Sequence, residues 1–312
     1  MRICSLLPSS TEIVFALGLG DSLVGVTHEC DFPLQTAQIP AVTSSVVNGE
    51  SMTGKEIHDA ITGLVHGGSS IYDLDRELLD EARPDLILTQ ELCEVCAVSY
   101  SQVEAAASML QCDTRVVSLE PNTLDQILDT IRIVGGLAGK ESRAESVVSK
   151  LRSRIERVAK TAARAQKKPR VLCMEWIDPV FIGGHWVPEM VDLAGGEDGI
   201  GIAGQPSFQV DWPRIAEYNP DLIVVMPCGF SAGRALMEME KTAFPDEWHG
   251  LDAVGRGEVY VVDGSSYFNR PGPRVVDGLE ILAQIFHPEL FPAPEAKFGA
   301  LVKAPYPIRT GG

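Results

Sequence analysis

Two stretches decide the fold: residues 82–93, ARPDLILTQELC, and residues 218–229, YNPDLIVVMPCG. In both, a helix-like segment ends at Pro-Asp, a short apolar run follows, and the run stops in a polar loop that carries a cysteine. A short apolar run between turn residues is typical of a strand buried in a parallel sheet. The chain therefore contains one strand-and-loop unit twice, in its first and in its second half.

The repetition extends outward from these two stretches. Arg2-Ile-Cys-Ser and Arg170-Val-Leu-Cys each open a half, and Arg115-Val-Val-Ser and Glu258-Val-Tyr-Val each close one. Strand patterns alternate with helix patterns in both halves, which predicts an α/β fold with two Rossmann-like lobes and mostly parallel sheets. Two similar lobes in one chain predict a cleft between them, and such clefts bind small ligands.

Four segments follow from this pattern. We expect an N-terminal α/β lobe over residues 1–121, a connecting backbone helix over 122–167, a C-terminal α/β lobe over 168–290 and an irregular tail over 291–312. In the connecting segment, apolar residues such as Leu124, Ile127, Leu128 and Ile131 recur at helical spacing. This spacing predicts one long helix, or two nearly coaxial helices, between the lobes.

Composition excludes several classes of function. The chain has 312 residues and a formal charge of −17, whereas nucleic-acid binding needs clustered Lys and Arg. No apolar run approaches the ~20 residues of a membrane helix, so we expect no membrane insertion. The N-terminus shows no signal peptide, which predicts a cytoplasmic protein as the chain is written, or a periplasmic or extracellular one if this is the mature form. Seven irregularly spaced cysteines do not suggest a disulfide framework.

The loops after the predicted strands hold the candidate ligand contacts, because ligands of parallel sheets lie beyond the carboxyl ends of the strands. Aromatic residues are only 6% of the chain, yet they collect in these loops, where their faces would hold a wide, flat ligand. For Trp176 and Phe181, packing in the core of the second lobe is the alternative. The second-lobe candidates are Trp176, Phe181, His185, Trp186, Phe230, Tyr267, Phe268, Asn269 and Arg270, and the first-lobe candidates are His28, Glu29, Cys30, Gln90, Cys93 and Cys96.

Cys93 and Cys96 form a C-x-x-C pattern. Together with His28 and Cys30 they could form a metal or thiol site, which leaves a metal-dependent or thiol-dependent enzyme as an alternative. Zinc sites usually show a second such pair, and none lies nearby. The chain also lacks the usual hydrolase, metalloprotease, phosphate-loop and dinucleotide motifs, so we expect no catalytic residues and no enzyme.

Several motifs carry a resemblance to a known family. They are Ser5-Leu-Leu-Pro-Ser-Ser-Thr-Glu-Ile, Val24-Gly-Val-Thr-His-Glu-Cys-Asp-Phe-Pro, Arg83-Pro-Asp-Leu-Ile, Asp178-Pro-x-Phe with Ala194-Gly-Gly-Glu, and Tyr267-Phe-Asn-Arg-Pro-Gly-Pro-Arg274. Across about residues 2–287 the chain resembles the cobalamin-binding member of the substrate-binding proteins that serve iron-siderophore, haem and cobalamin importers. The resemblance implies the class III periplasmic-binding-protein fold, two Rossmann-like lobes joined by a long backbone helix.

The resemblance also implies a function and a partner. It implies non-enzymatic binding of cobalamin or a related corrinoid in the cleft, for uptake, delivery or buffering, with an iron-siderophore or haem as the alternative ligand. By position it adds Pro8, Ser9 and Phe32 to the first-lobe wall. Relatives that dock on an ABC permease present an acidic residue on each lobe. Glu197 matches in the second lobe, and Glu104 lies near the corresponding region of the first.

Overall fold

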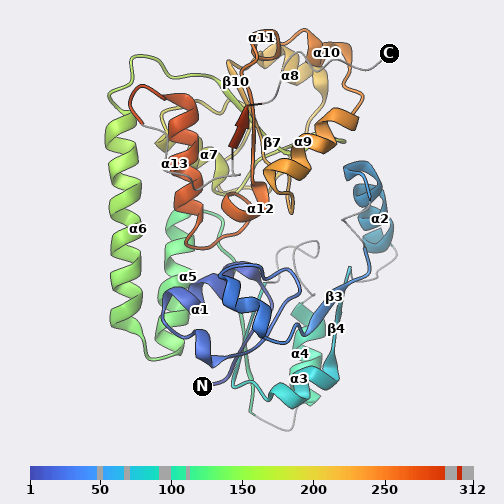
Figure 1. Cartoon of the computed structure of the whole chain (residues 1–312), viewed down its shortest axis with the longest axis vertical. Coiled ribbons are helices and arrows are strands. Elements are labelled where there is room, and N and C mark those ends of the chain that lie inside the picture. The colour runs from blue at the N-terminus through green and yellow to red at the C-terminus, as the bar shows by residue number, and fades with distance from the viewer. Residues whose placement is uncertain (48–51, 67–70, 91–99, 110–112, 292–300, 304–312) are drawn as a thin grey trace. The chain divides into compact units, whose positions relative to one another are not determined.

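The computed structural model describes residues 1–47, 52–66, 71–90, 100–109, 113–291 and 301–303. The chain divides into two compact units. Unit 1 consists of Met1–Pro121 and Asp125–Ser149, and unit 2 of Asn122–Leu124 and Lys150–Gly312. Each unit is built around its own sheet, with helices on both sides (Figure 1).

Unit 1 contains a four-stranded parallel sheet in the order β2-β1-β5-β6. Its strands are β1 (Ile3–Ser5), β2 (Leu23–Val26), β5 (Leu86–Thr89) and β6 (Arg115–Ser118). The sequence patterns predict three of them, β1, β5 and β6, and the motif that begins at Val24 opens in the fourth, β2. All four run in one direction, so the loops after them meet at one edge of the sheet.

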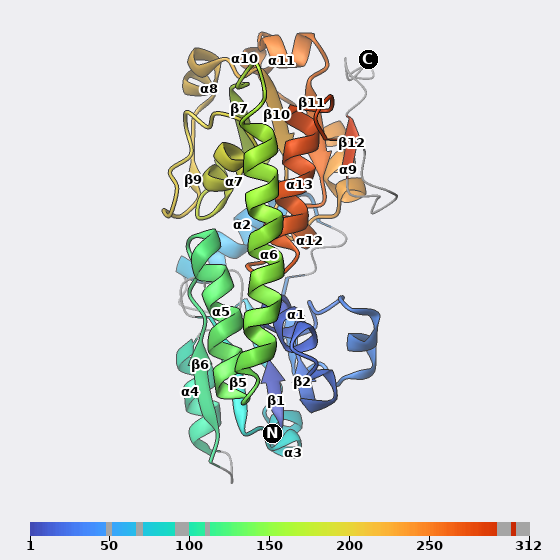
Figure 2. The same ribbon diagram turned by 90° about the vertical axis from the view of Figure 1, so that its left-hand side faces the viewer.

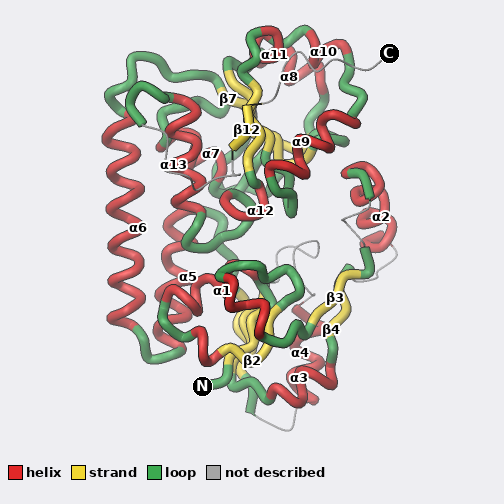
Figure 3. The backbone as a smooth tube through the Cα atoms, viewed as in Figure 1, coloured by secondary structure: helices red, strands yellow, loops and turns green. Residues whose placement is uncertain are grey.

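The helices of unit 1 flank this sheet. Helices α1 and α5 lie on one side, and α3 and α4 on the other (Figure 3). Their bounds are α1 (Pro8–Ala16), α2 (Gly54–His66), α3 (Arg76–Ala82), α4 (Tyr100–Met109) and α5 (Leu124–Leu137), with short 3₁₀ helices η1 (Gly20–Ser22) and η2 (Leu34–Gln38). Pro8 occupies the first turn of α1, and Leu7 caps the helix without a side-chain hydrogen bond. Proline suits that place because its missing N–H would have no partner there.

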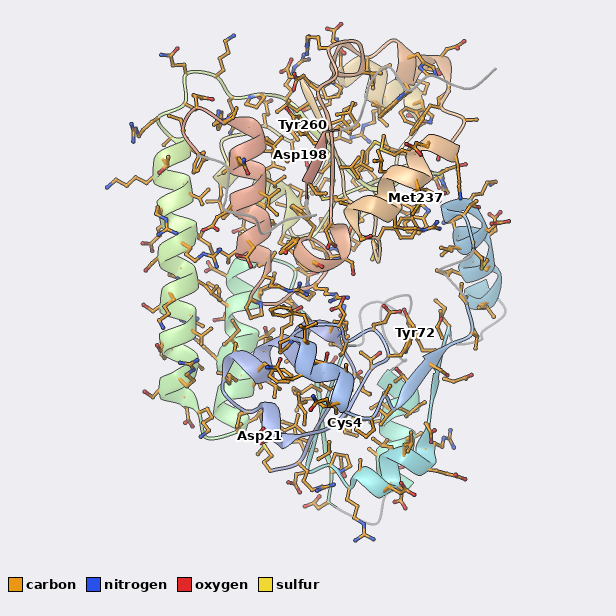
Figure 4. All side chains as sticks on the ribbon, in the orientation of Figure 1. Cys4, Asp21, Tyr72, Asp198, Met237 and Tyr260 are labelled. Carbon is orange, nitrogen blue, oxygen red and sulfur yellow. The ribbon has the colours of Figure 1, made fainter. Side chains whose placement is uncertain are left out.

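The core of unit 1 forms between the sheet and helices α3 and α4. Cys4, Ile87, Leu79 and Val103 are fully buried together there. The position of Cys4 inside the unit can be followed in Figure 4. Burial raises the pKa of its thiol to about 12, so Cys4 acts as a small apolar side chain, as the strand pattern predicts. An antiparallel pair, β3 (Thr43–Ser45) and β4 (Tyr72–Leu74), lies between β2 and β5 in the sequence.

The connecting segment forms two helices that are not coaxial. After α5, the chain turns at Gly139, whose φ of +62° suits glycine, and α6 (Glu141–Ala162) runs back beside α5 (Figure 2). Arg132 of α5 bonds Glu145 of α6, with 2.8 Å between Nε and Oε1. The prediction of one long helix or two nearly coaxial helices is therefore wrong. The chain passes from unit 1 to unit 2 within α6.

Unit 2 contains a six-stranded sheet in the order β12-β11-β10-β7-β8-β9. The three central strands are parallel, and the other three run antiparallel to their neighbours. The strands are β7 (Val171–Trp176), β8 (Phe181–Ile182), β9 (Phe208–Gln209), β10 (Leu222–Val225), β11 (Val259–Val262) and β12 (Leu301–Lys303). Strand β12 pairs with β11 and forms one edge of the sheet, so the tail that the sequence predicts to be irregular contributes a strand.

Helices pack on both sides of this sheet. Helices α7 and α13 lie on one side and α9 on the other (Figure 1). The bounds are α7 (Val187–Leu193), α8 (Trp212–Tyr218), α9 (Ala232–Lys241), α10 (Asp246–His249), α11 (Asp252–Gly255), α12 (Gly264–Tyr267) and α13 (Val275–Phe286). Arg154 of α6 fixes that helix to α13: its Nη2 lies 2.6 Å from both Asp277 Oδ1 and Glu280 Oε2.

Candidate functional site

The predicted first-lobe contacts lie around the carboxyl ends of β1, β2 and β5 in unit 1. Pro8, His28 and Cys30 are half-buried, and Ser9 is buried. Glu29 and Phe32 are exposed, with 46% of Phe32 accessible. The half-buried Gln90 follows β5 directly. Cys93 and Cys96 lie outside the described residues, so the structure leaves their predicted role untested.

Hydroxyl groups connect the end of β1 to the start of α1. Ser5 Oγ lies 2.6 Å from Ser10 Oγ, and Thr11 Oγ1 donates to Ser5 Oγ over 2.7 Å. Thr11 Oγ1 is also 3.0 Å from Cys30 Sγ. Ser5, Ser10 and Thr11 therefore form a buried polar cluster that holds the Cys30 loop against α1.

His28 is oriented by two threonines. Thr43 Oγ1 donates to Thr27 Oγ1 over 2.9 Å, so Thr43 Oγ1 accepts from the His28 ring at Nδ1, 2.8 Å away. The other ring nitrogen, Nε2, makes no hydrogen bond, although Glu29 Oε1 lies 3.3 Å from it without suitable geometry for one.

The predicted second-lobe contacts surround the carboxyl end of β7 in unit 2. Trp176 ends β7 and packs on Phe230, with the ring centroids 5.3 Å apart. Trp176, Phe181, His185 and Tyr267 are all half-buried, and the indole Nε1 of Trp176 is enclosed without a hydrogen-bond partner. A half-buried aromatic residue with an unused donor is suited to contact a ligand rather than only to fill a core.

Four of the predicted second-lobe contacts are buried: Phe230, Trp186, Phe268 and Arg270. Phe268 is fully buried, and Trp186 is only 7% exposed. Trp186 Nε1 donates to the Phe268 carbonyl over 2.8 Å, so the two residues fix the loop after α12 to the start of α7. Arg270 is 9% exposed, and its Nη2 donates to Ser265 Oγ over 3.1 Å. These contacts favour structural roles for Phe268, Trp186 and Arg270.

Glu175 is the centre of a hydrogen-bond network at the same strand end. Its Oε1 accepts from Asn269 Nδ2 over 2.9 Å, and its Oε2 accepts from Ser207 Oγ. Ser207 Oγ in turn accepts from the Gly184 N–H over 3.1 Å. Burial raises the pKa of Glu175, and the bonds from Ser207 and Asn269 partly oppose that shift. The Oδ1 atom of Asn269 is enclosed and has no hydrogen-bond partner.

Gly184 makes this network possible. A Cβ atom at Gly184 would lie 2.5 Å from the Gln205 carbonyl and from the Ser207 nitrogen, so only glycine lets that backbone pass. The neighbouring His185, with φ of +51°, donates its N–H to the Gln205 carbonyl and accepts from the Gly204 N–H. Ser207 has no signal in the sequence, because this contact joins residues far apart in the chain.

The described residues contain no cluster of three or more His, Cys, Asp or Glu side chains that could hold a metal ion. Nor does any helix among them combine the length and the apolar composition that crossing a membrane requires.

Comparison with known proteins shows the family to which this sequence belongs. The sequence model of the periplasmic binding protein family matches residues 3–265. An uncharacterised ABC transporter substrate-binding lipoprotein, YvrC, of Bacillus subtilis is 26% identical over 93% of this chain and 81% of its own length. The vitamin B12-binding protein of Vibrio cholerae is 23% identical over 89% of this chain and 86% of its own length.

A solved structure shows the same fold. The periplasmic haem-binding protein of Pseudomonas aeruginosa superimposes with a TM-score of 0.72 at 21% identity, over 96% of both chains. The expected class III binding-protein fold and the resemblance to importer substrate-binding proteins are confirmed. This chain belongs to the periplasmic binding protein family, whose model spans all but the last part of its sequence.

Proposed function

We propose that this chain binds cobalamin or a related corrinoid as the substrate-binding protein of an importer. The observation that carries the proposal is the strand end of β7, where Trp176 is half-buried and its enclosed Nε1 has no hydrogen-bond partner. The likeness to a protein named for vitamin B12 binding supports it. The expected position of the ligand, between the lobes, remains a prediction.

The chemistry of a corrinoid fits these groups. A corrinoid is a broad disc with an apolar face and a fringe of amides. Trp176, Phe181 and Tyr267 offer aromatic surface for the face, and Trp176 Nε1 offers a donor for an amide carbonyl. In unit 1, Pro8, Ser9, His28, Glu29, Cys30, Phe32 and Gln90 remain proposed contacts, and in unit 2 His185 joins the three aromatic residues.

Haem is the second candidate, and His28 is the observation that favours it. A histidine that ligates a metal usually donates from its other ring nitrogen to a neighbouring acceptor. His28 shows that arrangement, because its Nδ1 is bonded to Thr43 and its Nε2 makes no hydrogen bond. Glu29 would have to turn away from Nε2 before the ring could reach a metal.

Delivery to an ABC permease is the remaining part of the proposal. Substrate-binding relatives such as the B. subtilis lipoprotein are named for this transport system. Glu197 and Glu104 are both exposed, as residues that dock on a permease have to be. A pull-down of the detergent-solubilised permease with the purified protein tests it, with Glu197→Gln and Glu104→Gln expected to weaken capture.

Ligand titration decides between the two candidates. Calorimetry and visible absorbance are measured with cyanocobalamin and, separately, with haemin. We expect saturable one-to-one binding of cyanocobalamin and weaker binding of haemin, and Trp176→Phe should weaken cobalamin binding. No cobalamin binding at about 1 mM ligand, a binding free energy weaker than about −4 kcal/mol, would refute the proposal. Tight haemin binding that is lost in His28→Ala would establish the alternative.

A further inference from the structure

The network around Glu175 has a fixed direction. The Gly184 N–H donates to Ser207 Oγ, so the hydroxyl hydrogen of Ser207 is left for Glu175. On the other side, Asn269 uses Nδ2 to donate to Glu175 Oε1. Both carboxylate oxygens therefore receive a donor, and these two bonds oppose the burial that raises the pKa of Glu175.

This direction decides which end of the Asn269 amide is left over. The opposite orientation would place Oδ1 against Glu175 Oε1, two acceptors with no hydrogen between them. The unused end is therefore the acceptor Oδ1, which has no hydrogen-bond partner. Buried polar atoms of this kind are rare and call for an explanation such as a ligand or a functional role.

Asn269 is also held in place by its backbone. Its N–H donates to the Gly264 carbonyl over 2.9 Å, at the start of α12. Asp263 caps α12 through the Ser266 N–H, over 2.8 Å, and the Trp186 bond fixes the Phe268 carbonyl. The acceptor is thus held at a defined point on the same strand end as Trp176.

We propose that Asn269 Oδ1 and Glu175 form a subsite that selects a carboxamide N–H of the ligand and rejects a carboxylate. This inference rests on the proposed function and deepens it. An amide N–H supplies the donor that Oδ1 lacks, whereas a carboxylate has only acceptors and would face Oδ1 with no hydrogen between them. Since Oδ1 is enclosed, neighbouring side chains have to move aside as the ligand enters.

Binding of corrinoids that differ in one group tests the subsite. Single peripheral amides of cyanocobalamin are hydrolysed to carboxylates, and each monocarboxylate is titrated against wild-type protein at pH 7.5 by calorimetry. We expect at least one monocarboxylate to bind about 10- to 100-fold more weakly than cyanocobalamin, the range for leaving a buried polar group unpaired. Equal binding of every monocarboxylate overturns the inference.

A polarity-reversing variant tests the role of Glu175. In Glu175→Gln, the new amide can donate to Asn269 Oδ1, which turns the Asn269 donors toward the ligand. We expect the affinity ratio between cyanocobalamin and the discriminated monocarboxylate to fall at least about 5-fold. Glu217→Gln, an exposed position of α8, is the matched control and should leave the ratio unchanged. An unchanged ratio in Glu175→Gln also overturns the inference.

The outcomes separate the two proposals. Cobalamin binding without discrimination removes the subsite and leaves the proposed function in place. Absence of binding to any corrinoid removes the proposed function and the subsite with it. The wild-type comparison needs no variant, so a folding defect in Glu175→Gln, recognised by circular dichroism, does not prevent the test.

Discussion

Two tryptophans of unit 2, ten residues apart, should respond in opposite ways to the same substitution. Trp186 Nε1 donates to the Phe268 carbonyl over 2.8 Å, whereas Trp176 Nε1 is enclosed and has no hydrogen-bond partner. Replacing either residue by phenylalanine removes the N–H and keeps an aromatic ring. We expect Trp186→Phe to lower the stability of unit 2 and Trp176→Phe to leave it unchanged or raise it.

The size of the difference follows from hydrogen-bond energetics. Trp186→Phe leaves a buried carbonyl without its donor, which costs about 1–3 kcal/mol. Trp176→Phe removes a donor that already lacks a partner, so the same desolvation cost is relieved rather than added. Both variants lose some packing, and the loss is larger at the more buried Trp186, which is 7% exposed. We therefore expect Trp186→Phe to be less stable than Trp176→Phe by at least about 1 kcal/mol.

Thermal and urea unfolding, followed by near-UV circular dichroism, measure this difference. For a unit of this size, about 1 kcal/mol corresponds to about 2–4 °C in Tm. Cobalamin titration of the folded variants gives the complementary result: Trp176→Phe should weaken binding, and Trp186→Phe should change it little. Equal stability losses in the two variants, or weaker binding only in Trp186→Phe, would show that the two roles are assigned wrongly.

Three further predictions concern unit 2. Gly184→Ala should unfold at lower temperature and bind ligand more weakly, because the new Cβ would lie 2.5 Å from backbone atoms. The control Gly233→Ala in α9 has open space around the new Cβ and should be neutral or stabilising in the same thermal unfolding measurements. Arg154→Met should cost about 1.5–3 kcal/mol in urea unfolding, because two carboxylates of α13 lose a charged donor. Burial raises the pKa of Asp198, so its contribution to stability is greatest at acid pH and is lost as pH rises through the folded pKa. Arg170 lowers the pKa of Asp221, whose contribution is lost instead as pH falls, so Asp198→Asn and Asp221→Asn should change the slope of stability against pH in opposite directions.

Much of the fold could be predicted because its strands are short apolar runs between clear turn residues. The six strand patterns named in the sequence correspond to β1, β5, β6, β7, β10 and β11. The helical spacing of Leu124, Ile127 and Leu128 was equally informative, and all three side chains are buried. Periodicity indicates which face of a helix is apolar, but it does not show that the chain reverses at Gly139. The hairpin arrangement of α5 and α6 was therefore missed.

The candidate site could be predicted only to the level of loops. The rule that ligands lie beyond strand ends identifies the loops after β7, β10 and β11, and Trp176, Phe230 and Asn269 do lie there. It cannot distinguish a ring that faces a ligand from one that is needed for packing, because both are aromatic residues in the same loops. Two neighbours in the sequence illustrate this: Phe268 is fully buried, whereas Tyr267 is half-buried.

What separates ligand contacts from structural residues here is the state of their polar atoms. Glu175 and Trp176 are adjacent at the end of β7, where the pairing with β8 is irregular. Each of the two is associated with one enclosed polar atom that has no hydrogen-bond partner. For Trp176 this atom is its own indole Nε1. For Glu175 it is Oδ1 of Asn269, whose Nδ2 donates to Glu175. Since one is a donor and the other an acceptor, a ligand fringed with amides can satisfy both, whereas a ligand fringed only with carboxylates can satisfy the donor alone. On this basis the strand end of β7 favours a corrinoid over haem.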